Sequence, residues 1–357
     1  MPDSALSPQL EIELESMFLE AIRKHGLPGL AVGITRDFEP VYVGVFGVLD
    51  QSTRGPVTQD TLFHMASVSK SLVSTAVMQL AERGRIRLDD LIVKYLRYFR
   101  FQDERSDDIT IRQVLSHVSG IPHVRDTQSY NWHKPEYDDG ALERYVRGLK
   151  TTQLACSPSE KFSYSDIGYD ILGDLIAKVS GIPFEGYVRE HLLSPLGMKA
   201  SNLCAPREAN PTLVAKPHVL NADGESIVSS VYPYNRVHAP SSTFCSNIIE
   251  MNTWAMVHLR RGELDGHRIL SQSSYEVMWA PVVTVSPKVS MGLGWFIRNS
   301  DAGTEVYLTG TDHGFTTQFS LYLDWQLSVT VICNAEWGKP WKIAADAAQI
   351  IMKDSQN

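Results

Sequence analysis

Ser67 and Lys70 lie three residues apart in the segment Ser-Val-Ser-Lys, at the expected start of a helix. In a helix, this spacing brings two side chains onto one face and into contact. A serine hydroxyl becomes an effective nucleophile when a neighbouring group accepts its proton, and a lysine can do so if burial or a second cation lowers its pKa. The pair therefore predicts nucleophilic catalysis by Ser67, although a capping serine followed by a solvated lysine would give the same pattern.

Tyr164 stands at the head of another expected helix, in the segment Tyr164-Ser165-Asp166. A tyrosine next to a lysine can share its proton, because each charge stabilises the other and the pair titrates as a unit. An apolar segment surrounds Ser67, which favours a buried helix start over an exposed one. The three residues Ser67, Lys70 and Tyr164 are thus the candidate catalytic group.

The sequence predicts β-strands at both ends of the chain and helices between them, and these elements must position the three residues. An amphipathic segment at 8–25 precedes two alternating, β-branched runs that predict a hairpin, and similar runs at the far end lead to a helix at 340–353. The region between them is mainly helical, with a capping box at Thr110 and Gln113 and C-terminal glycines at Gly84 and Gly181. We expect one α/β (α+β) sheet domain from residues 1–60 and 289–357, and a mainly helical inserted domain from residues 61–288.

Four segments give the chain a specific resemblance. ASVSKSLVSTAVMQLAERGRIRLDD, ITIRQVLSHVSGIP, FSYSDIGYDILGDLIAKVSG and LLSPLGM resemble the signature blocks of the serine β-lactamase-like superfamily, in its order and spacing, within a likeness running from about Pro28 to Ala335. The superfamily includes class C β-lactamases, penicillin-binding proteins, D-aminopeptidases, lactamase-like esterases and the lovastatin acyltransferase. The resemblance implies a mainly antiparallel sheet flanked by helices plus a helical domain. It also implies Ser67 as nucleophile with Lys70 and Tyr164, and it places Asp166 where the family has Asn or Asp.

The third family block departs from the usual pattern. Gly314-Phe315 anchors its register, so Leu308-Thr309-Gly310 stands where the family has Lys-Thr-Gly, His-x-Gly or Trp-x-Gly. Gly310 would permit a close backbone approach, and the backbone N–H groups of Ser67 and Thr311 would form the oxyanion hole. The residues expected to contact substrate are Asp166, Leu308, Thr309, Gly310 and His313.

Composition excludes several other classes of protein. The chain has 357 residues, 43% of them hydrophobic and 21% charged, with a net charge of −8, which argues against nucleic-acid binding. No apolar run is long enough for a membrane helix and no secretory signal is visible, so a cytoplasmic location is expected. Four scattered cysteines and the histidines at 117, 123 and 133 lack metal-ligand spacing, and no metal or organic cofactor is implied.

These observations predict a serine hydrolase that forms an acyl-enzyme. Because Leu308 offers neither charge nor hydrogen bond to a substrate carboxylate, a carboxylesterase acting on neutral or apolar small-molecule esters is the first choice. His313 could supply the missing donor if it turned into the cleft. A D-amino-acid amidase or peptidase, an acyltransferase, a weak β-lactamase, and a catalytically idle binding scaffold remain alternatives. The oligomeric state is left open.

Overall fold

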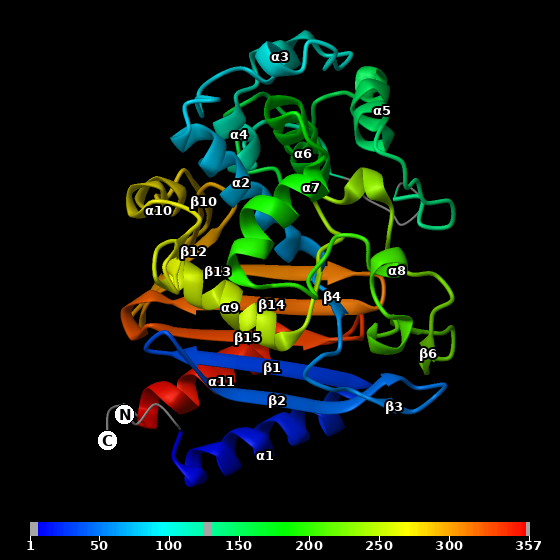
Figure 1. The fold of residues 1–357 in the computed structure, drawn as a ribbon, viewed down its shortest axis with the longest axis vertical. Coiled ribbons are helices and arrows are strands. Elements are labelled where there is room, and N and C mark those ends of the chain that lie inside the picture. The colour runs from blue at the N-terminus through cyan, green and yellow to red at the C-terminus, as the bar shows by residue number, and fades with distance from the viewer. Residues whose placement is uncertain (1–5, 124–129, 355–357) are drawn as a thin grey trace.

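A nine-stranded antiparallel sheet forms the centre of the protein in a computed structural model that describes residues 6–123 and 130–354. Its strand order is β10-β11-β12-β13-β14-β15-β1-β2-β3, and β14, β15, β1 and β2 cross the lower half of Figure 1. The strands are β1 (Gly29–Arg36), β2 (Glu39–Asp50), β3 (Gly55–Pro56), β10 (Val283–Ser286), β11 (Val289–Met291), β12 (Phe296–Ser300), β13 (Gly303–Asp312), β14 (Phe315–Tyr322) and β15 (Leu327–Cys333).

The two ends of the sequence meet in the middle of this sheet. β1 pairs with β15 from Leu30 opposite Cys333 to Arg36 opposite Leu327, and β1 pairs with β2 on its other side. The sheet assembled from both chain ends is therefore confirmed. The sheet already begins at β10, a few residues before the expected boundary at 289, and the division into two domains stays a prediction.

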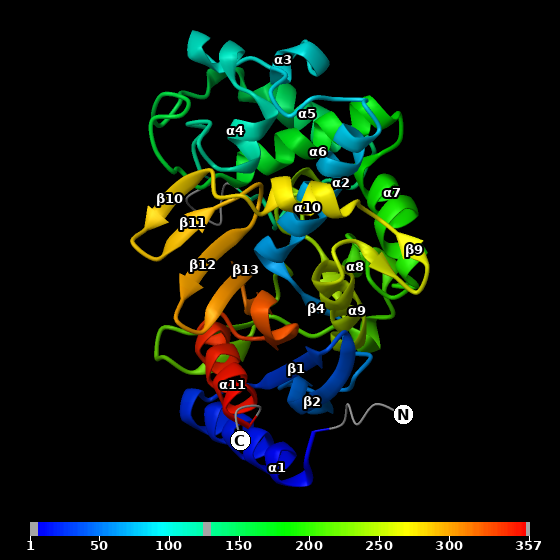
Figure 2. The same ribbon diagram turned by 90° about the vertical axis from the view of Figure 1, so that its left-hand side faces the viewer.

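Helices cover both faces of the sheet. Because side chains alternate along a strand, Leu30, Val32 and Ile34 point to one face, where α1 (Pro8–His25) and α11 (Pro340–Asp354) complete a hydrophobic cluster. Ala31 points to the other face, toward the main core that includes α2 (Lys70–Glu82) and α9 (Ile248–Leu259). Figure 2 shows α11 and α9 on opposite sides of β1.

The region between the sheet segments is mainly helical, and its helices α2 to α7 occupy the upper half of Figure 1. Its helix α6 packs against α2, α4 and α5, so the segments carrying Tyr164 and Ser67 are held next to each other. Three short strand pairs, β4–β7, β5–β6 and β8–β9, were not anticipated. The further helices are α3 (Ile92–Tyr95), α4 (Ile111–Leu115), α5 (Ala141–Gly148), α6 (Asp166–Ser180), α7 (Phe184–Val188), α8 (Ala205–Glu208) and α10 (Gln272–Met278). The further strands are β4 (Phe63–His64), β5 (His218–Leu220), β6 (Ser226–Val228), β7 (Cys245–Ser246), β8 (Glu263–Leu264) and β9 (His267–Arg268).

The helix signals in the sequence are confirmed. Thr110 and Gln113 form a complete capping box at the start of α4. Gly181 ends α6 in the left-handed conformation, with φ of 84°. The α1 and α11 helices begin at the expected residues.

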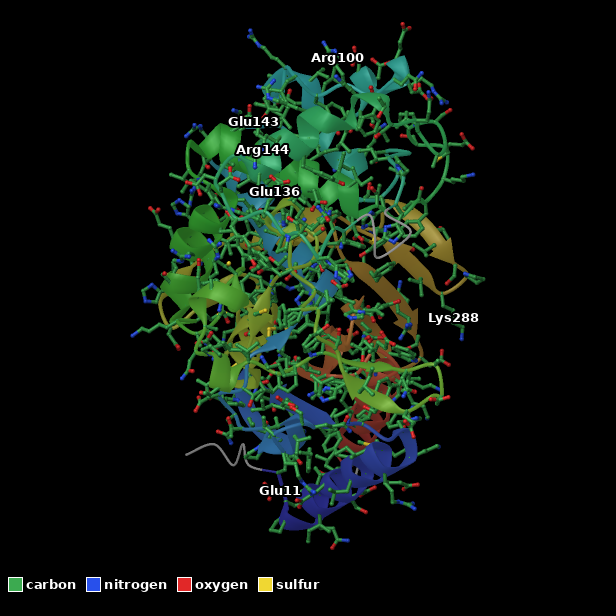
Figure 3. All side chains as sticks on the ribbon, turned by 90° about the vertical axis from the view of Figure 1, so that its right-hand side faces the viewer. Glu11, Arg100, Glu136, Glu143, Arg144 and Lys288 are labelled. Atoms are coloured by element: carbon green, nitrogen blue, oxygen red, sulfur yellow. The ribbon has the colours of Figure 1, made fainter. Side chains whose placement is uncertain are left out.

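The surface of the helical region carries ion pairs. Arg144 binds Glu136 and Asp138 near α5, and Arg144 and Glu136 are labelled close together in Figure 3. Exposed pairs of this kind contribute little to stability, so the buried clusters carry the fold. No helix among the described residues is long and apolar enough to cross a membrane.

Candidate active site

Ser67 lies in a tight turn that immediately precedes α2. Residues Ala66–Ser69 form a 3₁₀ turn, and the α-helix proper begins at Lys70, one turn later than the sequence pattern suggested. The Ser69 hydroxyl donates to the Ala66 carbonyl and accepts from the backbone N–H of Phe244, which fixes the turn. Ala66 has a positive φ of 48°, an unfavourable conformation for a non-glycine residue. Such strain is commonly found at functional sites.

The ammonium group of Lys70 has three acceptors. Its Nζ lies 3.0 Å from Ser67 Oγ, 2.8 Å from the Ser241 carbonyl oxygen and 2.6 Å from Asp166 Oδ1. The Lys70 side chain is only 1% exposed. The first two contacts are hydrogen bonds donated by Lys70 and the third is an ion pair with Asp166, so this geometry fits the charged form of Lys70.

Tyr164 completes the predicted trio. Its hydroxyl lies 2.9 Å from Ser67 Oγ, and Lys70 Nζ lies 5.1 Å from the centre of its ring. The buried ring of His117 stacks on Tyr164 at 4.3 Å, and His117 Nδ1 accepts a hydrogen bond from the Ser165 amide. The structure thus brings Ser67, Lys70 and Tyr164 together, and His117 supports the tyrosine from behind.

The electrostatics of the trio depend on Asp166. Burial alone would lower the pKa of Lys70, but the Asp166 carboxylate outweighs this and raises the pKa above its ordinary value. Burial would likewise raise the pKa of Asp166, but Lys70 holds it below its usual range. The pKa of Tyr164 is raised, mainly by burial, with Lys70 opposing the shift and Asp166 adding to it. We had expected burial to make Lys70 a neutral base, and the ion pair with Asp166 reverses that expectation.

Asp166 is the first residue of α6 and is buried next to Lys70. It is 4% exposed, and its Oδ2 accepts a hydrogen bond from the Tyr130 hydroxyl and lies 3.4 Å from His123 Nδ1. A carboxylate enclosed in this way binds Lys70 and leaves little surface for a substrate, which corrects the expected substrate contact. Tyr130 and His123 were missed as neighbours of the site, because nothing in their local sequence marks them.

Strand β13 passes directly beside the nucleophile turn. A Cβ atom on Gly310 would lie 2.5 Å from the Met65 carbonyl oxygen and 3.3 Å from the Ser67 backbone nitrogen. Glycine is therefore required here, as expected, but the backbone it approaches belongs to the nucleophile turn. This contact sets the distance between Ser67 and β13.

The edge of β13 next to this turn is open. β12 pairs with β13 only as far as Phe296 opposite Tyr307, and a two-residue turn joins Asp312 to Phe315 of β14. Because antiparallel hydrogen bonding alternates, Gly310 and Asp312 direct their backbone groups toward β14, and Thr309 and Thr311 direct theirs away from it. The Thr311 N–H thus faces the open edge and is not paired with β14.

The segment from Leu308 to His313 was expected to contact substrate, but its side chains have other partners in the structure. Leu308 is 3% exposed and packs in the main core on the same sheet face as Gly310, so it is enclosed and does not line an open cleft. The Thr309 hydroxyl donates to the Thr317 carbonyl oxygen. His313 binds Ser229 Oγ through Nε2 at 2.8 Å, and its ring lies 5.6 Å from that of Trp132. His313 is therefore already hydrogen-bonded away from Ser67.

The remaining polar residues considered in the sequence are the candidate metal ligands and His117. Outside residues 1–5, 124–129 and 355–357, no group of three or more His, Cys, Asp or Glu side chains is arranged to hold a metal ion. His117 is buried, and burial together with the charge of Lys70 lowers its pKa to about 3. It is thus a neutral, structural histidine.

Comparisons with known proteins agree with the fold. The Beta-lactamase family model matches residues 14–351, so the chain belongs to the Beta-lactamase family. Penicillin-binding protein 4 of Amycolatopsis lactamdurans is 31% identical over 290 residues, covering 77% of this chain and 72% of that protein. Esterase EstB of Burkholderia gladioli is 29% identical over 218 residues, covering 58% of this chain and 55% of EstB.

Two further similarities concern length and fold. Protein flp of Staphylococcus aureus (strain MW2) is 23% identical over 325 residues; the match covers 90% of this chain but only 62% of flp. The octameric penicillin-binding protein homologue from Pyrococcus abyssi superposes with a TM-score of 0.84 at 24% identity, covering 96% of this chain and 77% of that one. At this identity the superposition shows the fold.

Proposed function

We propose that this protein is a carboxylesterase that transfers the acyl group of neutral or apolar esters through an acyl-enzyme on Ser67. The observation that carries the proposal is the double contact of Ser67 Oγ, 3.0 Å from Lys70 Nζ and 2.9 Å from the Tyr164 hydroxyl. This geometry supplies a nucleophile, a proton acceptor and a fixed positive charge in one buried place.

In the proposed reaction Lys70 stays protonated and Tyr164 moves the proton. Tyr164 first loses its proton to solvent, and the ammonium of Lys70 stabilises the resulting phenolate. Ser67 Oγ then attacks the ester carbonyl carbon and gives its proton to Tyr164, and the backbone N–H groups of Ser67 and Thr311 bind the oxyanion. The carbon–oxygen bond to the leaving group breaks as Tyr164 protonates that oxygen. Water attacks the acyl-enzyme in the same way and releases the carboxylic acid.

The preference for neutral substrates follows from the charges around Ser67. The ammonium of Lys70 is paired with Asp166, Leu308 is uncharged and enclosed, and His313 is hydrogen-bonded to Ser229. None of these three side chains offers a free cation to a substrate carboxylate such as that of a penicillin. Burying an unpaired carboxylate costs several kcal/mol, so substrates that carry one should bind and react much less well than neutral esters. The similarity to Esterase EstB points the same way.

A second candidate is hydrolysis of D-amino-acid amides or peptides. The open edge of β13 at Thr309 and Thr311 favours it, because unpaired backbone groups can bind the amide backbone of a substrate as an added strand. The similarity to Penicillin-binding protein 4 supports this candidate. An ester needs fewer of these hydrogen bonds, so the two candidates predict different substrate profiles.

The experiment compares kcat/KM for p-nitrophenyl butyrate, a D-alanine p-nitroanilide and penicillin G, with the acylated residue identified by mass spectrometry. We expect the ester to exceed penicillin by at least about a hundredfold, equivalent to roughly 2.7 kcal/mol in the barrier. The Ser67→Ala variant is the control for uncatalysed hydrolysis. Equal rates for ester and penicillin would overturn the esterase assignment, and a faster anilide would favour the second candidate.

A further inference from the structure

Asp312 is a buried carboxylate that joins three segments of the chain behind the site. Its side chain is 7% exposed, and its Oδ2 lies 3.0 Å from Nε2 of the fully buried His64. The Ser242 hydroxyl donates to the same carboxylate oxygen. One carboxylate on β13 therefore binds β4 and the segment before β7 at the same time.

Each of these residues is adjacent to a part of the proposed catalytic machinery. Asp312 directly follows Thr311, and Ser242 directly follows Ser241, whose carbonyl oxygen lies 2.8 Å from Lys70 Nζ. His64 precedes Ser67 by three residues. One oxygen atom of Asp312 therefore contacts the segment that leads into the nucleophile turn and the segment that carries the acceptor for Lys70.

We propose that Asp312 is a positioning residue: by binding His64 and Ser242 together, it holds the Thr311 amide at the spacing from Ser67 that the oxyanion requires. The inference rests on the proposed hydrolytic function. Gly310 brings β13 against the nucleophile turn through van der Waals contact, and Asp312 adds a directional bond two residues further along.

The charges around His64 favour an ion pair. Burial alone would lower the pKa of His64, but its hydrogen bond with Asp312 outweighs this and raises the pKa to about 9. The other groups that face His64 are Cys245 of β7, which contributes in the same direction, and the aromatic rings of Tyr232 and Phe315. The pair is therefore charged at neutral pH, and it is lost as the pH rises through about 9.

Ser242, His64 and Asp312 are not a second nucleophilic triad. In such a triad the histidine separates the serine from the carboxylate, whereas here the Ser242 hydroxyl donates directly to Asp312. Ser242 Oγ lies 3.4 Å from His64 Nε2 and the residue is 6% exposed. Its proton is held by the carboxylate, so this cluster is built to fix geometry.

The test uses Asp312→Asn, which keeps the shape and removes the charge, and Ser242→Ala, which removes one hydrogen bond in case the first variant folds poorly. The matched control is Thr35→Val, which removes a buried 2.7 Å hydrogen bond to Ser328. Thr35 pairs with Ser328 of β15, and Ser328 is five residues away from Cys333 on the same strand. Cys333 pairs with Thr316 at the other end of β14, so the Thr35 hydrogen bond lies roughly 16 Å from that end of the sheet. Three quantities are measured for each: kcat and KM for p-nitrophenyl butyrate, and the inhibition constant of phenylboronic acid, whose tetrahedral adduct places an oxygen where the oxyanion forms.

For Asp312→Asn we expect kcat to fall by about tenfold to a hundredfold and boronate affinity to weaken in parallel, while KM changes less than about twofold. Ser242→Ala should show the same pattern to a smaller degree, and Thr35→Val should leave kcat within about twofold even if it lowers the melting temperature.

Two results would overturn the inference. One is a folded Asp312→Asn or Ser242→Ala protein with wild-type kcat and boronate affinity. The other is a loss in these variants no greater than that in Thr35→Val at matched melting temperature. Failure of the proposed function itself would look different, because the wild type would then not be labelled at Ser67 by a serine-directed phosphonate.

Discussion

Lys70 Nζ lies 2.6 Å from Oδ1 of Asp166, and both side chains are almost completely enclosed. In the proposed mechanism this ion pair keeps Lys70 charged. Tyr164, whose hydroxyl lies 2.9 Å from Ser67 Oγ, is then the group that accepts the proton. Burial and Asp166 both raise the pKa of Tyr164, so activity should increase with pH from neutrality into the alkaline range.

Asp166→Asn should move this pH profile to lower pH. Removing the carboxylate charge lowers the pKa of Tyr164 and that of Lys70. The deprotonated, active form of Tyr164 should therefore be populated at a pH lower by about one unit or more. The measurement is kcat/KM for a neutral ester between pH 6 and 10. Asp174→Asn is the control, because Asp174 is a buried carboxylate on the same helix that binds Tyr98 instead, at 2.8 Å. A profile that stays in place in Asp166→Asn would show that Asp166 does not control the proton acceptor.

Ser67→Ala should abolish turnover and phosphonate labelling together. The loss should be on the order of a thousandfold or more, as is typical when a nucleophile acting with a coupled base is removed. Both quantities can be followed on one sample by ester hydrolysis and intact-protein mass spectrometry. Retention of more than about a tenth of the activity would exclude Ser67 as the nucleophile.

Gly310→Ala should damage the site while leaving Ser67 in the protein. The added Cβ would lie 2.5 Å from the Met65 carbonyl oxygen, so β13 or the nucleophile turn must shift, at a cost of about 1–3 kcal/mol in unfolding free energy. We expect kcat to fall at least about tenfold, because the Thr311 amide moves with the strand. Gly148→Ala is the control, since nothing lies within 4 Å of a Cβ at that helical glycine. Equal activity of the two variants would contradict the close packing of β13 on the turn.

His313→Gln should leave the ratio of ester to penicillin hydrolysis within about threefold of wild type. His313 is held by Ser229 and lies against Trp132, so it does not supply the donor that Leu308 lacks. The measurement is kcat/KM for p-nitrophenyl butyrate and for penicillin G in both proteins. A change in their ratio well beyond threefold would show that this side chain turns into the site.

The sequence predicted the site better than it predicted the charges within it. Ser67 and Lys70 are three residues apart, and a helical spacing alone brings them into contact. Tyr164 was a candidate from its place at the head of a helix, and the family resemblance implied its role. The protonation state of Lys70 could not be predicted, because it depends on how deeply Asp166 is enclosed after packing. The orientation of Leu308 could not be predicted either, since the phase of β13 is set by the contact of Gly310 with a turn about 240 residues earlier in the chain. Local signals such as the capping box of α4 were sufficient because they involve neighbouring residues only.

The pairing of β1 with β15 also has a consequence for how the active protein forms. These two central strands join residues about 300 positions apart, from Leu30 opposite Cys333 onward, and β13, which carries Thr311, reaches β1 only through β14 and β15. Such long-range pairing is slow, because the entropy of closing a large loop is lost before the contacts form. Regain of esterase activity during refolding should therefore lag behind regain of helical circular dichroism. A truncation that removes β15 should leave Ser67, Lys70 and Tyr164 in the chain but separate β14 from β1, so the sheet that holds β13 in place would be incomplete.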